Sequence, residues 1–171
     1  MKNNSKSEPE IRLERLDDAP KIDNLHSETF GPGRYTKSAF RYREKREHLI
    51  NISFVLVDQN QIIGSVRYWE ILVNNASALL LGPIVIHPDH RGRGYGAKLI
   101  DYSVNKCNEA NHNIIILVGD LSYYSKVGFK RMLGKEIIFA GPVNNDRVLY
   151  REIKTNIIED SSKIIIKPYA D

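Results

Sequence analysis

The pattern of apolar and polar positions predicts several short strands in the first half of the chain. Apolar and charged residues alternate over residues 10–16, and residues 52–58 form a mostly apolar run, so each segment is expected to be a strand. Residues 62–73 and 76–86 continue the pattern as two further strands, with short polar turns between them. The first part of the chain is therefore predicted to form an antiparallel meander.

Two helices are expected between the first two strands. Asp17 and Asp18 can cap a helix whose first turn contains Pro20. Thr36 can cap a second helix that runs to residue 48. The basic residues within 41–46 alternate with glutamates, which favours a solvated helix face over a binding patch.

The pattern changes after residue 86. A glycine-rich turn leads into a helix at residues 97–110, where apolar residues recur at helical spacing. The β-branched segment 114–118 follows as a strand. A unit of strand, helix and strand makes its two strands parallel, so 76–86 and 114–118 are predicted to run in the same direction.

The remaining elements complete an α+β class. A short helix near residues 121–126 precedes a strand that Gly128 opens, and residues 148–153 form another strand. The result is a mixed sheet with helices on both faces. Residues 10–153 are interpreted as a single domain, residues 1–9 as a disordered leader, and 154–171 as a tail that can add an edge strand.

Composition and charge narrow the classes of function. Apolar residues make up 42% of the 171 residues, as in ordinary globular proteins, and no apolar run is long enough to cross a membrane. The polar start of the chain does not read as a secretory signal, and the single cysteine suits a reducing cytoplasm. A net charge of +4 is too mild to indicate nucleic acid, and the histidines lack metal-ligand spacing. A homodimer is one oligomeric state that the sequence leaves open.

The chemically informative segment is the loop at residues 91–96, with the sequence RGRGYG. Its three glycines alternate immediately before a helix, where backbone N–H groups lack helical partners and the helix dipole is positive. This arrangement binds phosphate, and Arg91, Arg93 and Lys98 add positive charge beside it. The ligand class predicted from the residues is a phosphorylated cofactor.

Two other nucleotide motifs fit this segment less well. A P-loop ends in Gly-Lys-Ser/Thr, whereas positions 97–99 read Ala-Lys-Leu. Gly92, Gly94 and Ala97 match the dinucleotide pattern G-x-G-x-x-A, and Asp120 stands where a ribose-binding acid would belong. However, that fold turns from the strand directly into the first glycine, whereas here five residues separate the strand from Gly92. The 51 residues after Asp120 are also too few for the rest of a doubly wound domain. A dinucleotide-binding oxidoreductase is therefore the third-ranked function.

The loop resembles the signature of the GNAT acyltransferases: Gln or Arg, two residues, Gly, one residue, Gly or Ala. The resemblance extends over residues 11–153. It is similar in particular to a YhbS-like subgroup of predicted bacterial acetyltransferases, through the segments Phe30-Gly31-Pro32-Gly33-Arg34, Leu81-Gly82-Pro83 and Leu117-Val118-Gly119-Asp120. It implies a GNAT fold: a mixed, mostly antiparallel sheet of about seven strands flanked by about four helices, with parallel fourth and fifth strands that splay apart.

The resemblance also implies a reaction. Acetyl-CoA would be the cofactor, and its acetyl group would pass directly to a primary amine in a ternary complex, without a metal. Backbone groups of the fourth strand would bind the pantetheine arm and the glycine loop the pyrophosphate. The cofactor-binding residues implied are Ile84, Val85, Ile86, Arg91, Gly92, Arg93, Gly94, Tyr95, Gly96 and Tyr124.

The resemblance assigns a catalytic acid and leaves the base open. Tyr124 lies four residues before Gly128, at the family's position for the tyrosine that protonates the departing thiolate. Strand 114–118 lacks the glutamate that serves some relatives as a base, so Asp120, Glu70 and His87 are candidates, beside water or an amine that arrives neutral. The missing base leaves a non-catalytic acyl-CoA-binding sensor as the alternative function.

Overall fold

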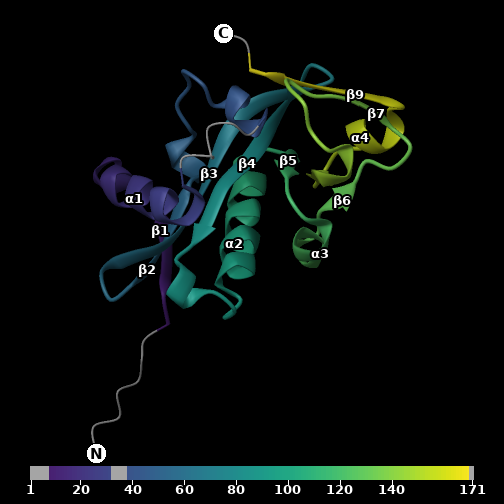
Figure 1. Cartoon of the computed structure of the whole chain (residues 1–171). Coiled ribbons are helices and arrows are strands. Elements are labelled where there is room, and N and C mark those ends of the chain that lie inside the picture. Colours follow the sequence, from purple (N-terminus) through teal and green to yellow (C-terminus); the bar gives the residue numbers. More distant parts are fainter. Residues whose placement is uncertain (1–7, 32–37, 170–171) are drawn as a thin grey trace, which may run out of the picture.

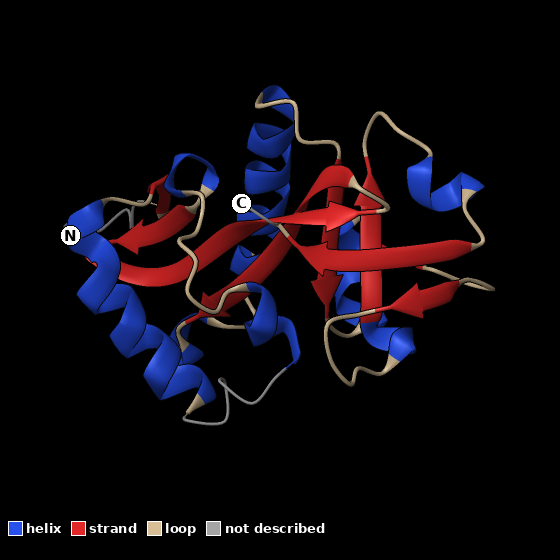
Figure 2. Cartoon of the chain, turned by 90° about the horizontal axis from the view of Figure 1, so that it is seen from above, coloured by secondary structure: helices blue, strands red, loops and turns tan. Residues whose placement is uncertain are grey.

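A twisted mixed sheet runs through the molecule and carries helices on both faces (Figures 1 and 2). The structure is a computed structural model that describes residues 8–31 and 38–169. Its strands are β1 (Glu10–Leu13), β2 (Phe54–Asp58), β3 (Gln61–Val73), β4 (Ala76–Ile86), β5 (Ile114–Val118), β6 (Lys130–Arg131), β7 (Glu136–Ile138), β8 (Val148–Glu152) and β9 (Lys163–Pro168). The α-helices are α1 (Ala19–Phe30), α2 (Tyr95–Glu109), α3 (Leu121–Tyr124) and α4 (Ile157–Asp160).

The strand order is β1-β2-β3-β4-β5-β8-β6, and β9 pairs with both β3 and β7. All neighbours along the main path are antiparallel except β4 and β5, which are parallel. The predicted α+β class and GNAT-type sheet are therefore confirmed. Among the described residues, no helix is long and apolar enough to cross a membrane.

Alternation along β3 places α1 and α2 on opposite faces of the sheet. Val66 and Tyr68 point into the core that α2 covers, where they pack with Leu99 and other apolar residues of that helix. Ser65 points to the other face, and its hydroxyl lies 3.1 Å from Nε2 of His26 on α1. The view from above shows the sheet between these two helices (Figure 2).

The contact between β4 and β5 is short. The two strands pair at Leu79 with Ile115 and at Leu80 with Ile116. Beyond this point β4 carries a bulge, because its register against β3 moves from Tyr68–Leu81 to Val66–Ile84. The two strands therefore diverge beyond Leu80 and Ile116, and this opening is called the fork below.

The second predicted helix is wrong in its length and type. Residues Ser38–Tyr42 form a short 3-10 helix, η3, and the chain then turns, while the expected start at Thr36 lies outside the described residues. Tyr42 explains the interruption. Its hydroxyl donates to the carbonyl of Ile166 at 2.9 Å and accepts from the N–H of Ala140 at 2.7 Å, which anchors the segment to the core. Lys45 then adopts a positive φ of 59°, which a continuing α-helix does not allow.

The later part of the chain contains elements that the pattern did not predict. Strand β7 and helix α4 are both short, three and four residues, and the strand opened near Gly128 has two residues. In the tail, β9 pairs antiparallel with β3 and parallel with β7.

Most of the N-terminal leader lies outside the described residues, but Glu8 forms an ion pair with Lys98 at 2.7 Å.

A buried ionic cluster connects the segments that lie on the α1 side of the sheet. The carboxylate of Glu14 accepts from Arg67 on β3 at 2.6 and 3.0 Å, and Nε2 of His48 lies 3.1 Å from it. Asp23 on α1 lies 3.7 Å from the same guanidinium. Burial alone would raise the pKa of Glu14, but the interactions with His48 and Arg67 outweigh burial and leave that pKa below its usual value.

We predict that Glu14→Gln destabilises the fold by about 3–5 kcal/mol, because it leaves the Arg67 guanidinium with a weaker partner in a buried site. Glu109→Gln removes an exposed ion pair with Lys106 and should cost less than about 0.5 kcal/mol. Urea denaturation of both variants at pH 7 measures the difference.

The same residue predicts a dependence on pH. The folded-state pKa lies below that of an unfolded glutamate, so the contribution of Glu14 is present above about pH 4.3 and is lost as the pH falls through the lower folded value. The stability of the wild type should therefore fall more steeply below pH 4.3 than that of Glu14→Gln. Parallel curves for the two proteins would contradict this assignment.

Candidate functional site

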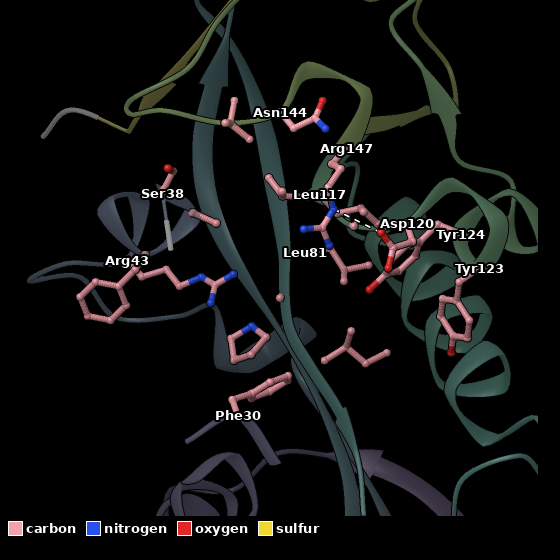
Figure 3. Close-up of a pocket in the computed structure, with 18 of the residues that line it drawn as sticks. Phe30, Ser38, Arg43, Leu81, Leu117, Asp120, Tyr123, Tyr124, Asn144 and Arg147 are labelled. Carbon is pink, nitrogen blue, oxygen red and sulfur yellow. Dashed lines mark ion pairs between the residues drawn. The ribbon is translucent and has the colours of Figure 1, made fainter. Parts of the chain in front are cut away.

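A cavity of about 620 Å³ lies at the fork, where residues of the end of α1 and of η3 help to line it (Figure 3). The strand residues that line it come from both sides of the divergence, 81–84 on β4 and 117–120 on and after β5. The remaining lining residues are Phe30, Ser38, Ala39, Phe40, Arg43, Tyr123, Tyr124, Pro142, Val143, Asn144 and Arg147. The cavity thus combines the sheet, η3, α3 and the loop before β8.

The edge of β4 that faces the fork provides unpaired backbone. Ile84, Val85 and Ile86 pair with Val66, Ser65 and Gly64 of β3, but beyond Leu80 no residue of β5 pairs with β4. An extended ligand with amide groups can add to such an edge as another strand would. The predicted pantetheine-binding residues therefore lie where backbone groups of β4 lack a neighbouring strand.

The glycine loop leads from the end of β4 into α2. Gly92 and Gly94 have φ values of 75° and 77°, a conformation that glycine adopts without strain. The first helical hydrogen bond runs from the N–H of Lys98 to the carbonyl of Gly94, so the N–H groups at positions 95–97 lack helical acceptors. Such N–H groups, at the positive end of a 15-residue helix, suit an anionic ligand.

The basic side chains of this loop support its backbone. Nε of Arg91 donates to the carbonyl of Ile86 at 3.1 Å, and Nη2 of Arg93 donates to the carbonyl of Asp89 at 3.2 Å. Gly96 has a further role that the sequence did not reveal. A Cβ atom at that position would lie within 2.1 Å of the Tyr123 hydroxyl, so glycine allows α3 to approach the first turn of α2.

The two tyrosines of α3 differ in direction (Figure 3). The ring of Tyr124 packs on Gly119, where an added Cβ would lie 2.2 Å from Cε2, and its hydroxyl points into the cavity. Tyr123 turns instead toward α2. Burial raises the pKa of Tyr124 to about 12, with smaller contributions from Tyr123 and Asp120. The Tyr124 phenol is therefore protonated at neutral pH and can donate a hydrogen bond or a proton.

Comparison with known proteins agrees with this geometry. A family model for the acetyltransferase (GNAT) domain matches residues 50–131, which include β4, the glycine loop, β5 and α3. The chain is 28% identical over 123 residues to the uncharacterised N-acetyltransferase YhbS of Escherichia coli K12, covering 70% of this chain and 72% of that protein. Residues 50–131 therefore match a GNAT acetyltransferase domain, as the resemblance implied. The family and the enzyme class predicted from the sequence are confirmed.

Two solved GNAT structures share the fold. The crystal structure of YhbS from Escherichia coli in complex with CoA superimposes with a TM-score of 0.80 at 20% identity, covering 96% of this chain and 93% of that one. A GNAT acetyltransferase from Brucella melitensis in complex with acetyl-CoA gives a TM-score of 0.69 at 23% identity, covering 95% and 96%. The agreement extends over nearly the whole chain.

The three candidates for the GNAT general base lie in different places. Asp120 lines the cavity, and its carboxylate pairs with Arg147 at 3.2 Å (Figure 3). Glu70 on β3 lies outside the lining of this cavity, near the Ser77 hydroxyl at 3.5 Å. His87 follows β4, where its Nδ1 accepts from the N–H of Asp89. The structure therefore brings Asp120 and Tyr124 together and keeps the other two candidates apart from them.

The sequence did not identify several cavity residues of this GNAT domain. Arg43 was assigned to a solvated helix face, but the segment is not a continuous helix and its guanidinium lies in the cavity. Phe40, Asn144 and Arg147 belong to segments without a recognised motif. Periodicity carried no signal for them, because η3 and the 3-10 turn Asn145–Arg147 are both short.

Cys107 is a core residue of α2, as its spacing predicted. It is fully buried beside Tyr68 and Val104. Burial raises the pKa of the thiol to about 12, although a hydrogen bond with the Tyr68 hydroxyl acts in the opposite direction. The thiolate, which is the nucleophilic form, is therefore scarce at neutral pH.

We predict that Cys107 is inert in the folded enzyme. At pH 8 a thiol of this pKa is ionised in about one molecule in 10⁴, so reaction with a thiol reagent should be at least 100-fold slower, on the order of two decades, than in the denatured chain. Cys107→Ala should keep turnover within about twofold of the wild type, since the residue contributes packing and no chemistry. Stopped-flow labelling and steady-state assays measure both, and lost turnover in a stably folded variant would indicate an acyl-cysteine route.

Proposed function

We propose that this GNAT enzyme transfers the acetyl group of acetyl-CoA to a primary amine by direct attack in a ternary complex. The observation that carries the proposal is the fork, which has a helix N-terminus suited to an anion on one side and a cavity with a protonated tyrosine on the other. The two GNAT structures with CoA and acetyl-CoA support this choice of donor. A cytoplasmic location, inferred from the single cysteine, belongs to the same proposal.

The residues divide into a donor side and an acceptor side. The backbone of residues 91–97 would bind the pyrophosphate, and the free edge of Ile84, Val85 and Ile86 would bind the pantetheine amides. The acetyl group would then reach the fork from the α2 side. The amine would enter from the cavity on the α1 side.

The chemistry needs one proton removed and one supplied. The amine nitrogen forms a bond to the thioester carbonyl carbon, the C–S bond breaks, and the sulfur leaves as a thiolate that must be protonated. We assign Tyr124 as the donor of that proton, because its phenol is buried, protonated and directed into the cavity. Asp120 is the candidate that can accept the amine proton from within the same cavity, either directly or through water.

Calorimetry tests the choice of cofactor. The enzyme should bind CoA and acetyl-CoA with a Kd in the micromolar range, about −8 kcal/mol, and NAD much more weakly. Tighter binding of NAD than of CoA would contradict the proposal and favour the oxidoreductase alternative. Tight CoA binding without CoA release in a broad amine panel would favour the acyl-CoA-binding sensor.

We predict that Gly94→Asp weakens acetyl-CoA binding by about 10-fold or more relative to Gly94→Asn. Asp and Asn both tolerate the left-handed conformation of Gly94, so the two variants share the backbone cost. They differ in a carboxylate that repels the pyrophosphate. Calorimetry on both variants isolates the charge effect.

Gly134→Asp provides a second control for the loop. Gly134 has a φ of 68° and an open surrounding, like Gly94, but it lies in the turn before β7. The Gly134→Asp variant should therefore bind acetyl-CoA with an affinity within about twofold of that of the wild type. Equal affinities for Gly94→Asp and Gly94→Asn would mean that the pyrophosphate binds elsewhere.

We predict that Tyr124→Phe lowers kcat by roughly 100-fold, within the usual range for general acid catalysis, and leaves acetyl-CoA affinity nearly unchanged. The ring that packs on Gly119 is retained, so the loss is chemical. Tyr123→Phe is the matched control, because its hydroxyl is directed toward α2 and should contribute less. Steady-state kinetics with direct CoA binding measure both variants. Wild-type kcat in Tyr124→Phe, under conditions where chemistry limits the rate, would exclude it as the acid.

A further inference from the structure

Arg43 occupies an unusual position for a charged side chain. It follows η3 and reaches the fork, where it lines the cavity from the side opposite Tyr124 (Figure 3). A Cβ atom on Gly82 would lie 2.9 Å from Nη2 of Arg43, so the guanidinium rests directly on the bulge of β4. Glycine at position 82 is what allows this approach.

Among the described residues, the guanidinium of Arg43 has no compensating charge. In the part of the chain that the structure describes, no carboxylate lies within 4 Å of it, and its buried Nε makes no hydrogen bond. Burial lowers the pKa of Arg43 to about 10, which still leaves the group charged at neutral pH. A partly buried charge without a partner is costly to the fold, and an anionic ligand in the cavity would supply the partner.

The other charges of the cavity do not serve this role. Among the described lining residues the charged side chains are Arg43, Arg147 and Asp120, and the last two pair with each other at 3.2 Å. Arg43 therefore gives the cavity an excess positive charge on its η3 wall. Much of the rest of the wall is apolar, including Phe30, Phe40 and Val143.

We propose that the acceptor amine also carries an anionic group, a carboxylate or a phosphate, and that Arg43 binds this group. The inference rests on the proposed acetyl transfer and specifies its acceptor. The planar guanidinium offers paired N–H donors that match either anion. With the anion on the η3 wall, the amine end of a small molecule is directed across the fork toward Tyr124 and Asp120. Arg43 is thus a specificity-determining residue that contacts substrate away from the reacting atoms.

Matched pairs of amines test this proposal. The probes are β-alanine with n-propylamine, phenylalanine with phenethylamine, and O-phosphoethanolamine with ethanolamine. In each pair the members differ mainly in the anionic group, and the third pair distinguishes phosphate from carboxylate. CoA release is measured for each probe, and calorimetry measures its binding to the enzyme saturated with CoA.

The expected result is a preference of about 10- to 100-fold in kcat/KM for the anionic member of at least one pair, as one charge-assisted contact provides. Arg43→Gln should remove that preference by raising KM for the anionic member of the pair. It should change kcat/KM for the neutral member by less than about threefold. Arg43→Lys should restore part of it, because the charge returns without the planar pair of donors. Arg46→Gln removes an equal charge from a residue that does not line the cavity and should leave the preference intact.

Stability distinguishes a binding role from a structural one. An arginine without a charged partner should be removable without loss, so Arg43→Gln should have a Tm equal to or above that of the wild type. The proposal is overturned if CoA binds but no anionic probe binds or reacts better than its neutral partner. It is also overturned if the preference survives in Arg43→Gln. Failure to bind CoA would instead contradict the proposed acetyl transfer itself.

Discussion

The divergence of β4 from β5 is the constraint on which the rest of the structure depends. Parallel strands in the middle of a sheet normally pair along their length, but here pairing ends at Leu80 and Ile116. The bulge at Gly82 turns β4 away while β5 stays paired with β8 from end to end. An opening in the centre of a sheet exposes backbone groups that a ligand can satisfy, so the fold itself prepares the binding site.

The two walls of the fork are held by different means. On the β5 side, Gly119 allows the Tyr124 ring to lie against the backbone, so the position of the phenol is set by packing. On the β4 side, the segment after η3 is held by Tyr42 in the core and by His48 beside Glu14. The ionic cluster of Glu14 and Arg67 therefore acts at a distance on Arg43, because its contact with His48 fixes the far end of the segment that carries this residue to the cavity.

The sequence predicted the parts of the molecule that local rules determine. The apolar and polar pattern identified β3 and β4, the β-branched run identified β5, and the alternate glycines located the start of α2 within two residues. The helix predicted around Arg43 was wrong, because the conformation of this segment follows from the burial of Tyr42 against β9. That contact joins residues 124 positions apart. Tyr124 was predicted from its spacing to Gly128 and Asp120 as one of three candidate bases, and both line the cavity. The Arg147 partner of Asp120 was not found, since no periodicity relates an irregular loop to the end of β5.

Strand β9 affects how the chain behaves outside its native state. It covers residues 71–73 of β3, beyond the reach of β2, and buries Ile164 and Ile166. A chain shortened before Lys163 would leave the backbone of Ile71 and Val73 as an apolar, unpaired strand edge. Such an edge pairs readily with another copy, so the last strand protects the enzyme from self-association and aggregation as well as completing its sheet.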